Sequence, residues 1–526
     1  MTTPQKLNQN TRTSSLQIIM LKKTRVALAI VSILALTTLF TDFTGDAHKY
    51  FGWMARIQFI PALLSASVLI LAGIVIATLL FGRIYCSVVC PAGIMQDIII
   101  RIHKLLGLTK KHGLTFHYKK AATICRIIIL VLFAALLILG ITNIACASLA
   151  GLIEPYSAYG RIANAFALPI WDFINDLIAI NSSGYTYYTV YRASSMLTAG
   201  IAGATLMALV CFSWFAGRDY CNKVCPVGTL LGFISRYSLL KPTIDTSKCN
   251  NCGRCERKCK SSCINAEAHT IDYSRCVACF NCVDSCPNNA LRYKPAFRRS
   301  VTAVAKEKET DAETADISRR NFLTSAGIIA GALAVKAAAA SGKDKLLPVR
   351  ATRLSTRETP VVPAGAHSLS NFRARCTACQ LCVSSCPNNV LRPSSELDSF
   401  MQPEMNFDKG YCRPDCNICS HVCPSGAICP ISLEEKCSTQ IGRATVDTST
   451  CLSAAEGVKC DSCERHCPAQ AIIMVETAEN GNLRPVVDES RCIGCGSCEY
   501  HCPVGRTGSA KGPAIYVEGI EVHHTV

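Results

Sequence analysis

The first half of the chain alternates between long apolar stretches and short charged segments. Four stretches approach the roughly 20 residues that cross a bilayer as a helix, and they cover residues 26–40, 60–80, 122–141 and 196–215. Residues 165–180 are also apolar, but this stretch is short and contains Asp172 and Asp176, which favours an interfacial helix over a fifth span. We therefore expect an α-helical four-span membrane unit over residues 25–240, after an N-terminal tail over residues 1–24.

The distribution of charge predicts the orientation of this unit. Seven Lys and Arg residues lie between the second and third stretches, whereas residues 143–195 hold only Arg161 and Arg192. Cytoplasmic loops carry the excess of Lys and Arg, so both ends of the unit are expected in the cytoplasm. The formal net charge of +17 comes from this half, because residues 342–526 hold 18 basic and 20 acidic residues. This distribution argues against a nucleic-acid partner.

An internal repeat marks the ends of the second and fourth stretches. FGRIYCSVVCPAG and AGRDYCNKVCPVG align without gaps and contain Cys86 and Cys90, and Cys221 and Cys225. Each Cys-Pro opens an amphipathic stretch, where proline suits the first helical turn and a helix N-terminus favours thiolate. The four sulfurs could hold an additional cluster, act as redox-active dithiols, or be paired structural cysteines.

Residues 241–297 contain two ferredoxin-type cysteine runs and form the expected block one. Three closely spaced thiolates and a fourth from the other run hold each 4Fe-4S cluster in two-cluster ferredoxins. Site 1 is therefore Cys249, Cys252, Cys255 and Cys286, and site 2 is Cys259, Cys276, Cys279 and Cys282. The first run departs from the pattern, since Lys260 replaces the proline and Cys263 offers a rival ligand.

Residues 342–526 repeat the arrangement twice and form the expected block two. The same crossing rule predicts four sites: site 3 is Cys376, Cys379, Cys382 and Cys423; site 4 is Cys386, Cys412, Cys416 and Cys419; site 5 is Cys451, Cys460, Cys463 and Cys502; site 6 is Cys467, Cys492, Cys495 and Cys498. Short apolar runs at 471–475 and 514–517 predict small strands around these sites. The expected fold is thus a helical membrane bundle with small α+β ferredoxin-like domains and six 4Fe-4S clusters.

Other uses of the cysteines fit less well. Zinc sites usually combine two Cys-x2-Cys pairs, whereas here each run has four cysteines. No Cys-x-x-Cys-His run occurs, and no histidine lies within the four apolar stretches, so no haem is expected. The remaining cysteines are expected to be small buried apolar residues: Cys125, Cys146, Cys211, Cys429 and Cys437.

The segment between the blocks predicts export of block two. A charged linker covers residues 298–317, and Ser318-Arg319-Arg320-Asn321-Phe322-Leu323 then opens a Gly/Ala-rich apolar stretch. This pattern over residues 318–341 is similar to a twin-arginine signal, with a chance Arg-Arg pair as the alternative. Block two is then expected in the periplasm, with the apolar stretch as a fifth span. Residues 338–341 also fit a cleavage site, so release of block two is the other outcome.

These motifs together resemble two families. Residues 20–295 resemble the membrane quinol dehydrogenase subunits of the NapH type, and residues 318–526 resemble the exported ferredoxins of the NapG and MauM types. The resemblance implies a multi-pass protein of the bacterial inner membrane that oxidises quinol from the quinone pool. Electrons would leave through 4Fe-4S clusters to a periplasmic or membrane-associated reductase or electron carrier. The fusion departs from both families and leaves the final acceptor open.

The sequence offers one candidate for the proton chemistry of quinol oxidation. Glu154 lies in EPYSAYGR on the expected periplasmic side, where it could accept a proton or be a simple loop carboxylate. A polyferredoxin that supplies electrons during maturation of an exported metalloenzyme is the competing hypothesis. A redox sensor would need a DNA-binding module, and none is visible in the sequence.

Overall fold

The computed structural model describes residues 5–42, 45–106, 115–142, 144–181, 196–295, 357–396, 398–477, 481–506 and 512–525. Residues 1–297 and 354–526 form one compact unit, which holds the membrane helices and both blocks. The linker at 298–317 and the expected twin-arginine segment at 318–341 lie outside the described residues.

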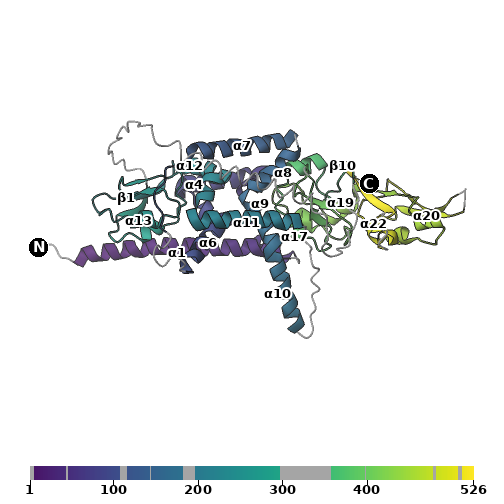
Figure 1. Cartoon of the computed structure of the whole chain (residues 1–526), viewed down its shortest axis with the longest axis horizontal. Coiled ribbons are helices and arrows are strands. Elements are labelled where there is room, and N and C mark those ends of the chain that lie inside the picture. The colour runs from purple at the N-terminus through teal and green to yellow at the C-terminus, as the bar shows by residue number, and fades with distance from the viewer. Residues whose placement is uncertain are drawn as a thin grey trace. The chain divides into compact units, whose positions relative to one another are not determined.

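Three helices in the described part are long and apolar enough to cross a membrane (Figure 1). They are α1 (Gln5–Thr41), α7 (Thr123–Thr142) and α11 (Met196–Ala216). Their spanning segments, Met20–Thr41, Thr123–Gly140 and Met196–Ala216, have mean hydropathies of 1.8, 2.7 and 1.9. Many of their apolar side chains are exposed, as on helices that face lipid.

The second expected span is divided, so the structure does not confirm the count of four spans. The stretch forms α3 (Phe59–Leu64) and α4 (Val68–Phe81), because Ala66 between them has a left-handed φ of 54°. At about 1.5 Å per residue, the 14 residues of α4 are shorter than the roughly 30 Å hydrocarbon core. This break is not predicted by hydrophobicity, because Ser65, Ala66 and Ser67 are all tolerated in apolar helices.

Shorter helices complete the membrane unit. They are α2 (Asp46–Arg56), α5 (Tyr85–Val88), α6 (Pro91–Leu105), α8 (Ile144–Ile153), α9 (Pro155–Ile162), the π-helix η1 (Ala163–Ala167), α10 (Leu168–Asn181), the π-helix η2 (Tyr220–Val224) and α12 (Pro226–Ser235). Helices α6 and α12 begin at the two repeat prolines, where a fixed φ and a missing N–H cost the helix nothing. Helix α10 has 14 residues and exposes Ile170, Phe173 and Leu177.

Block one is built from two small antiparallel sheets and two helical turns. Strand β1 (Leu240–Ile244) pairs with β4 (Leu291–Pro295), with Pro242 opposite Tyr293. Strand β2 (Ile264–Asn265) pairs with β3 (Thr270–Ile271). The turns α13 (Arg254–Arg257) and α14 (Asn281–Asp284) follow the second cysteine of each run.

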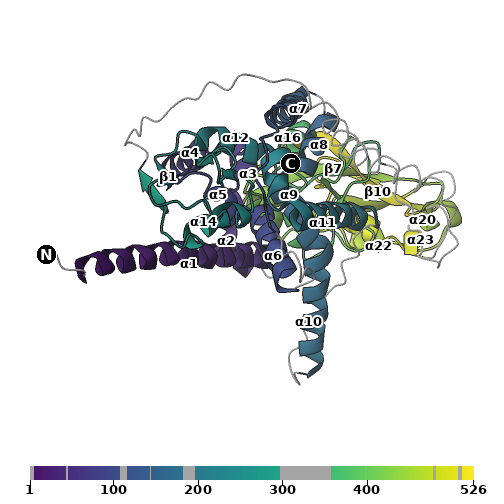
Figure 2. The same ribbon diagram turned by 60° about the vertical axis from the view of Figure 1, so that its left-hand side comes forward.

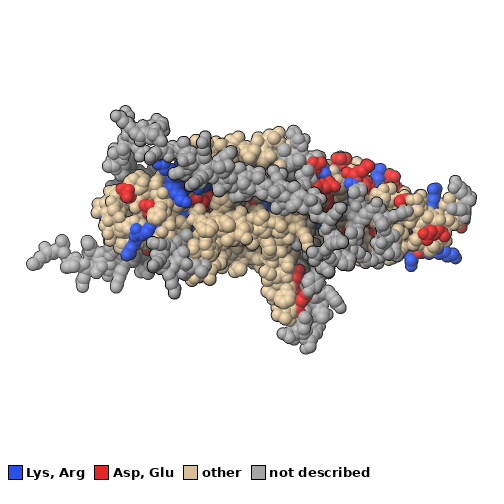
Figure 3. Space-filling view, viewed as in Figure 1, with Lys and Arg blue, Asp and Glu red and all other residues tan. Residues whose placement is uncertain are grey.

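The described residues of block two form three antiparallel strand pairs. They are β5 (Leu391–Pro393) with β6 (Pro403–Met405), β8 (Ile472–Glu476) with β9 (Leu483–Val487), and β7 (Thr439–Val446) with β10 (Ile515–Thr525), the last pair labelled in Figure 2. Its helices are α16 (Leu369–Arg375), α17 (Leu381–Ser384), α18 (Ile418–Val422), α19 (Leu433–Cys437), α20 (Leu452–Glu456), α21 (Ser462–Arg465), α22 (Ser497–His501) and α23 (Pro503–Arg506). On the face shown in Figure 3, Asp and Glu gather over this block, while the membrane helices are mostly uncharged.

The two blocks contact different connections of the membrane unit. Block one contacts the segment before α7, where the amide of Lys119 donates to the carbonyl oxygen of Ser262 at 3.3 Å, and Lys22 pairs with Asp284 at 2.6 Å. Block two contacts the connections expected on the other side of the membrane. The Arg56 guanidinium donates to the carbonyl oxygen of His421 at 3.2 Å, and the Asn164 amide donates to the Gln380 side chain at 2.8 Å.

Candidate iron-sulfur sites

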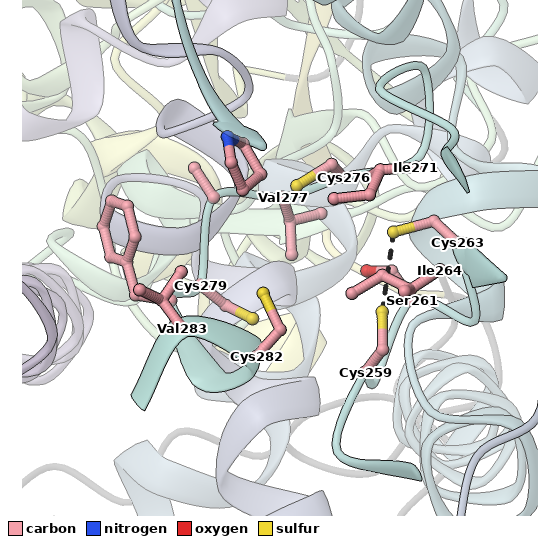
Figure 4. A pocket seen from close by; sticks show the side chains of 13 residues that line it. Cys259, Ser261, Cys263, Ile264, Ile271, Cys276, Val277, Cys279, Cys282 and Val283 are labelled. Atoms are coloured by element: carbon pink, nitrogen blue, oxygen red, sulfur yellow. Dashed lines mark hydrogen bonds between the residues drawn. The ribbon is translucent and has the colours of Figure 1, made fainter. Parts of the chain in front are cut away.

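The cysteines of block one surround two cavities. The four cysteines of site 1 line one of them. The four cysteines of site 2 line the other, together with Cys263 (Figure 4). The Sγ atoms of Cys259 and Cys263 are 3.5 Å apart. The geometry therefore leaves both of these cysteines within reach of site 2.

Three cavities in block two are likewise lined by the four cysteines of an expected site. Their cysteine linings are those of sites 3, 5 and 6, each with three cysteines from one run and the fourth from the paired run. At site 4, burial raises the pKa of the Cys419 thiol, and the neighbouring thiols of Cys412 and Cys386 raise it further. The cavities thus bring together the cysteines that the crossing rule groups at sites 1, 2, 3, 5 and 6.

The backbone around the regular runs is shaped to wrap a bulky group. The residue directly before the second cysteine has a positive φ in four runs: 53° at Asn251, 47° at Ala278, 54° at Ala378 and 73° at Gly494. A left-handed alanine is strained by about 1–3 kcal/mol and needs compensation from its surroundings, which metal binding can supply. Backbone amides also donate to cysteine sulfurs, as from Ala471 to Cys467 at 3.3 Å.

These features fit a 4Fe-4S cluster better than a single ion. The donors at each cavity are all thiols, the preferred ligands of such clusters. Among the described residues, no three His, Cys, Asp or Glu side chains converge closely enough to hold one metal ion. Each set instead encloses a cavity.

The sites of block two follow one another closely. Sites 3 and 4 exchange their fourth cysteines, as do sites 5 and 6. Sites 4 and 6 meet where the amide of Cys412 donates to the carbonyl oxygen of Cys495 at 2.9 Å. The order in space is therefore 3, 4, 6, 5, and site 3 is next to the membrane unit.

Site 3 adjoins the helix that Glu154 caps. Glu154 is 1% exposed and forms the N-cap of α9, accepting hydrogen bonds from the amides of Tyr156, at 3.0 Å, and Ser157. A Cβ added at Gly160 in the same helix would collide with the carbonyl oxygen of Cys379. Burial raises the pKa of the Glu154 carboxyl, although these hydrogen bonds oppose the shift. Glu154 is therefore a buried cap rather than a simple loop carboxylate.

The two repeat motifs come together in the membrane unit. Cys86, Cys90, Cys221 and Cys225, here called the four-cysteine centre, are each 3–4% exposed. Burial raises the pKa of Cys90 and Cys225 well above the ordinary thiol value. Cys86, Cys90 and Cys225 share one apolar cluster with Ala150 of α8 and Val277 of site 2. The centre thus packs in one cluster with residues of both block one and α8.

Two lysines near the sites were not assigned a role from the sequence. Lys436 is 8% exposed, and its ammonium group donates to the carbonyl oxygens of Arg413 and Cys416 at site 4. Lys260, which replaces the expected proline, is 4% exposed and pairs with Asp97 of α6 at 2.5 Å. The replacement of the expected proline by Lys260 was a sequence signal of a special role for this position. Its partner Asp97 could not be predicted, because it is 163 positions away in the sequence.

Models of iron-sulfur protein families match both halves of the chain. A 4Fe-4S binding domain matches residues 64–109 and 198–245, which contain the two repeats, and another matches residues 269–292. A 4Fe-4S dicluster domain matches residues 375–427 and 458–506. The chain is therefore an iron-sulfur protein in both blocks.

Curated relatives are ferredoxin-type proteins. The methylamine utilization ferredoxin-type protein MauM of Methylobacillus flagellatus is 33% identical over 27% of this chain and 64% of its own length. The ferredoxin-type proteins NapG and NapF of Escherichia coli are 29% and 32% identical over 34% and 24% of this chain, and over 77% and 69% of their own lengths. The chain spans less than two thirds of the MauM proteins that it matches. No solved structure matches it.

Proposed function

Because the chain belongs to the ferredoxin-type iron-sulfur proteins, as its likeness to NapF establishes, we propose that it oxidises quinol at the membrane. In this proposal sites 1 to 6 hold six 4Fe-4S clusters, and electrons leave to a periplasmic reductase or electron carrier. The membrane half and the exported half would be a permanent fusion of two proteins that are usually separate.

The observation that carries the proposal is the position of Glu154. It lies between the membrane helices and site 3, because it caps α9 while Gly160 of that helix packs on Cys379. The preceding residue is also held by the membrane unit, since the Tyr220 hydroxyl donates to the carbonyl oxygen of Ile153 at 3.3 Å. A proton acceptor beside an electron acceptor is what quinol oxidation requires.

Oxidation of one quinol to quinone releases two electrons and two protons. When bound, each 4Fe-4S cluster supplies the ability to take up and release one electron at a time. Glu154 would accept a proton on a carboxylate oxygen, and its raised pKa brings it closer to the pH at which proton transfer is efficient. Arg161 is fully buried in the same helix and favours the carboxylate form electrostatically, which keeps the acceptor available.

The contacts of the blocks support placing them on opposite sides of the membrane. Block one contacts the Lys-rich connection before α7, which the charge rule assigns to the cytoplasm. Block two contacts Arg56 and Asn164, in connections that the same rule assigns to the periplasm. This arrangement fits an export signal at residues 318–341.

Quinol reactivity distinguishes this function from the maturation hypothesis. The purified, detergent-solubilised chain would be mixed anaerobically with a reduced menaquinol analogue, and cluster reduction would be followed by absorbance and paramagnetic resonance. Rapid reduction that Glu154→Gln slows supports quinol oxidation. Clusters that stay oxidised with quinol but accept electrons from a low-potential donor would contradict it and favour a role in metalloenzyme maturation.

A further inference from the structure

The two repeats interlock around the four-cysteine centre with matching contacts. Arg83 Nη2 donates to Cys86 Sγ of its own repeat at 3.8 Å and to the carbonyl oxygen of Cys221 at 3.2 Å. Arg218 Nη1 donates to Cys221 Sγ of its own repeat at 3.6 Å and to the carbonyl oxygen of Cys86 at 2.9 Å. Each arginine therefore joins both copies, and the two copies build one centre.

The other two cysteines occupy matching helix N-termini. Cys90 and Cys225 are the N-caps of α6 and α12, with φ/ψ of −70°/117° and −70°/119°. The amide of Gly228 donates to Cys225 Sγ at 3.3 Å. Helices of 15 and 10 residues place a partial positive charge at these sulfurs, which stabilises thiolate ligands.

Two glycines allow this close approach. A Cβ added at Gly93 would collide with the carbonyl oxygen of Cys86 and lie 2.8 Å from Arg218 Nη1. A Cβ at Gly228 would meet the carbonyl oxygen of Cys221 and lie 2.8 Å from Arg83 Nη2. The sequence of both copies is thus adapted to bring the thiols and guanidinium groups together.

Buried polar atoms around the centre lack protein partners. Within the described part of the chain, this is true of Arg83 Nε, Arg218 Nη2, Gln96 Oε1 and Asn222 Nδ2, all on side chains that are no more than 2% exposed. Donors and acceptors without partners are costly in a protein interior. Three of these four atoms are donors, which suits an anionic group nearby.

The charges around the four-cysteine centre also favour an anionic group there. Arg218 has Asp97 at 2.7 Å, but no described carboxylate lies within ion-pair distance of Arg83, which is fully buried. Arg83 Nη1 instead donates to Asn222 Oδ1 at 2.8 Å and to the carbonyl oxygen of Ser274 at 3.1 Å. A buried cation without a counter-charge is strongly unfavourable. A cluster with four thiolate ligands carries the missing negative charge.

We propose that Cys86, Cys90, Cys221 and Cys225 are the ligands of one additional 4Fe-4S cluster shared between the two repeats. Each copy alone supplies two thiols, whereas such a cluster takes four, so the two matched segments make one site rather than two. Gln96, which donates to Cys221 Sγ at 3.3 Å, and the two arginines are positioning residues that hydrogen-bond the ligands.

The additional cluster would also provide a route for electrons between the two blocks. This extension rests on the proposed function. Val277, between two ligands of site 2, packs in the same apolar cluster as Cys86, Cys90 and Cys225. Ala150 of α8 belongs to the same cluster, and a Cβ at the adjacent Gly151 would lie 2.6 Å from the carbonyl oxygen of Thr377 in site 3. The centre is thus connected by packing to both site 2 and site 3 and would exchange one electron at a time with each.

Iron and acid-labile sulfide per purified full-length chain test the proposal. Wild type is expected to hold about 28 iron atoms, four for each of seven clusters. The double variant Cys86→Ser/Cys221→Ser is expected to hold about four fewer. The matched control Cys125→Ser/Cys211→Ser changes two cysteines of the same membrane unit that were expected to be buried but are exposed in the structure. It is expected to match wild type.

Unchanged iron in the Cys86→Ser/Cys221→Ser variant would overturn the proposal. If that variant does not fold, the wild-type count alone decides, since about 24 iron atoms with fully occupied sites 1 to 6 contradicts a seventh cluster. A count of about 28 in a chain that does not react with quinol would keep this inference and remove the proposed function.

Discussion

Asp97 of helix α6, whose side chain is 16% exposed, and the buried Lys260 of block one form an ion pair of 2.5 Å. Asp97 also pairs with Arg218 at 2.7 Å and Arg25 at 3.0 Å, so one carboxylate serves three cations. The amide of Arg218 donates in turn to the carbonyl oxygen of Lys260 at 2.8 Å. The residue that breaks the ferredoxin pattern is therefore one of the contacts between block one and the residues around the four-cysteine centre.

Asp97→Asn should weaken this contact. It leaves three buried or nearly buried cations without their shared counter-charge, and removing one partner of a buried ion pair costs about 3–5 kcal/mol. Thermal unfolding of the solubilised chain should show a clearly lower midpoint. The control Asp245→Asn changes a half-buried block-one carboxylate that accepts a hydrogen bond from Ser247 and lies 3.8 Å from Lys248. It should leave the midpoint nearly unchanged, because a solvent-accessible ion pair contributes little.

The pH dependence of this contact follows from the pKa of Asp97. Burial alone would raise it, but Arg218, Lys260 and Arg25 outweigh burial and hold the pKa far below the ordinary carboxyl value. A lowered folded-state pKa gives stability that is present above the unfolded pKa, about 4, and is lost only as the pH falls through the folded value. The contribution of Asp97, measured as the difference between wild type and Asp97→Asn, should be constant from about pH 8 to 5. A difference that fades within this range would contradict the ion-pair assignment.

Gly228→Ala should disturb the four-cysteine centre directly. The added methyl group meets the carbonyl oxygen of Cys221 and the guanidinium of Arg83, and overpacking of this kind typically costs about 1–3 kcal/mol. Thermal unfolding and iron content should both fall. Gly200→Ala in α11 is the matched control, because nothing lies within 4 Å of its added Cβ. Equal behaviour of the two variants would show that the repeats do not approach as described.

Glu154→Gln should slow reduction of the clusters by quinol. A positioned proton acceptor typically contributes about 10²–10⁴-fold to a rate, and glutamine preserves the size of the side chain without its basicity. Because burial raises the pKa of Glu154, the wild-type rate should rise with pH as the carboxylate form becomes populated, and the variant should lose that rise. Glu434→Gln, at an exposed position of block two, is the control. A pH-dependent rate retained in Glu154→Gln would exclude Glu154 as the acceptor.

Lys436→Met should lower the reduction potential at site 4. The buried ammonium group donates to the carbonyl oxygens of Arg413 and Cys416 and favours the more negative, reduced state. The ammonium group also hydrogen-bonds the site 4 sulfur of Cys412. A hydrogen bond to a charged group is worth about 1.5 kcal/mol, which corresponds to about 60 mV in a one-electron couple. Redox titration followed by paramagnetic resonance measures this shift, with exposed Lys459→Met as the control. A shift of equal size in both variants would remove the special role of Lys436.

Much of the structure could be predicted from local sequence patterns. The Cys-x2-Cys-x2-Cys runs set the grouping of thiols around the cavities because a short loop and a crossing cysteine allow few alternatives. The prolines at positions 91 and 226 likewise marked the starts of α6 and α12. The charge pattern of the loops places the connections that the two blocks contact on opposite sides of the membrane, and this stays a prediction.

Features that depend on contacts between residues far apart in the chain could not be predicted from the sequence. The left-handed Ala66 divides the second apolar stretch without any local signal, so hydrophobicity alone overestimated its helical length. The sequence left open whether Glu154 is a proton acceptor or a simple loop carboxylate. Only the fold shows that it caps α9. The pairing of Lys260 with Asp97, and of Arg83 with the Cys221 carbonyl, comes from tertiary packing of segments more than 130 residues apart.

The central claim is that the four-cysteine centre joins the two blocks, and single-turnover mixing with a reduced menaquinol analogue tests it most directly. Paramagnetic resonance of samples frozen at successive times would show which clusters are reduced in wild type and in Cys86→Ser/Cys221→Ser. Wild type should show reduction in both blocks, whereas the variant should show reduction confined to block two. Reduction of both blocks at the wild-type rate in that variant would contradict the account.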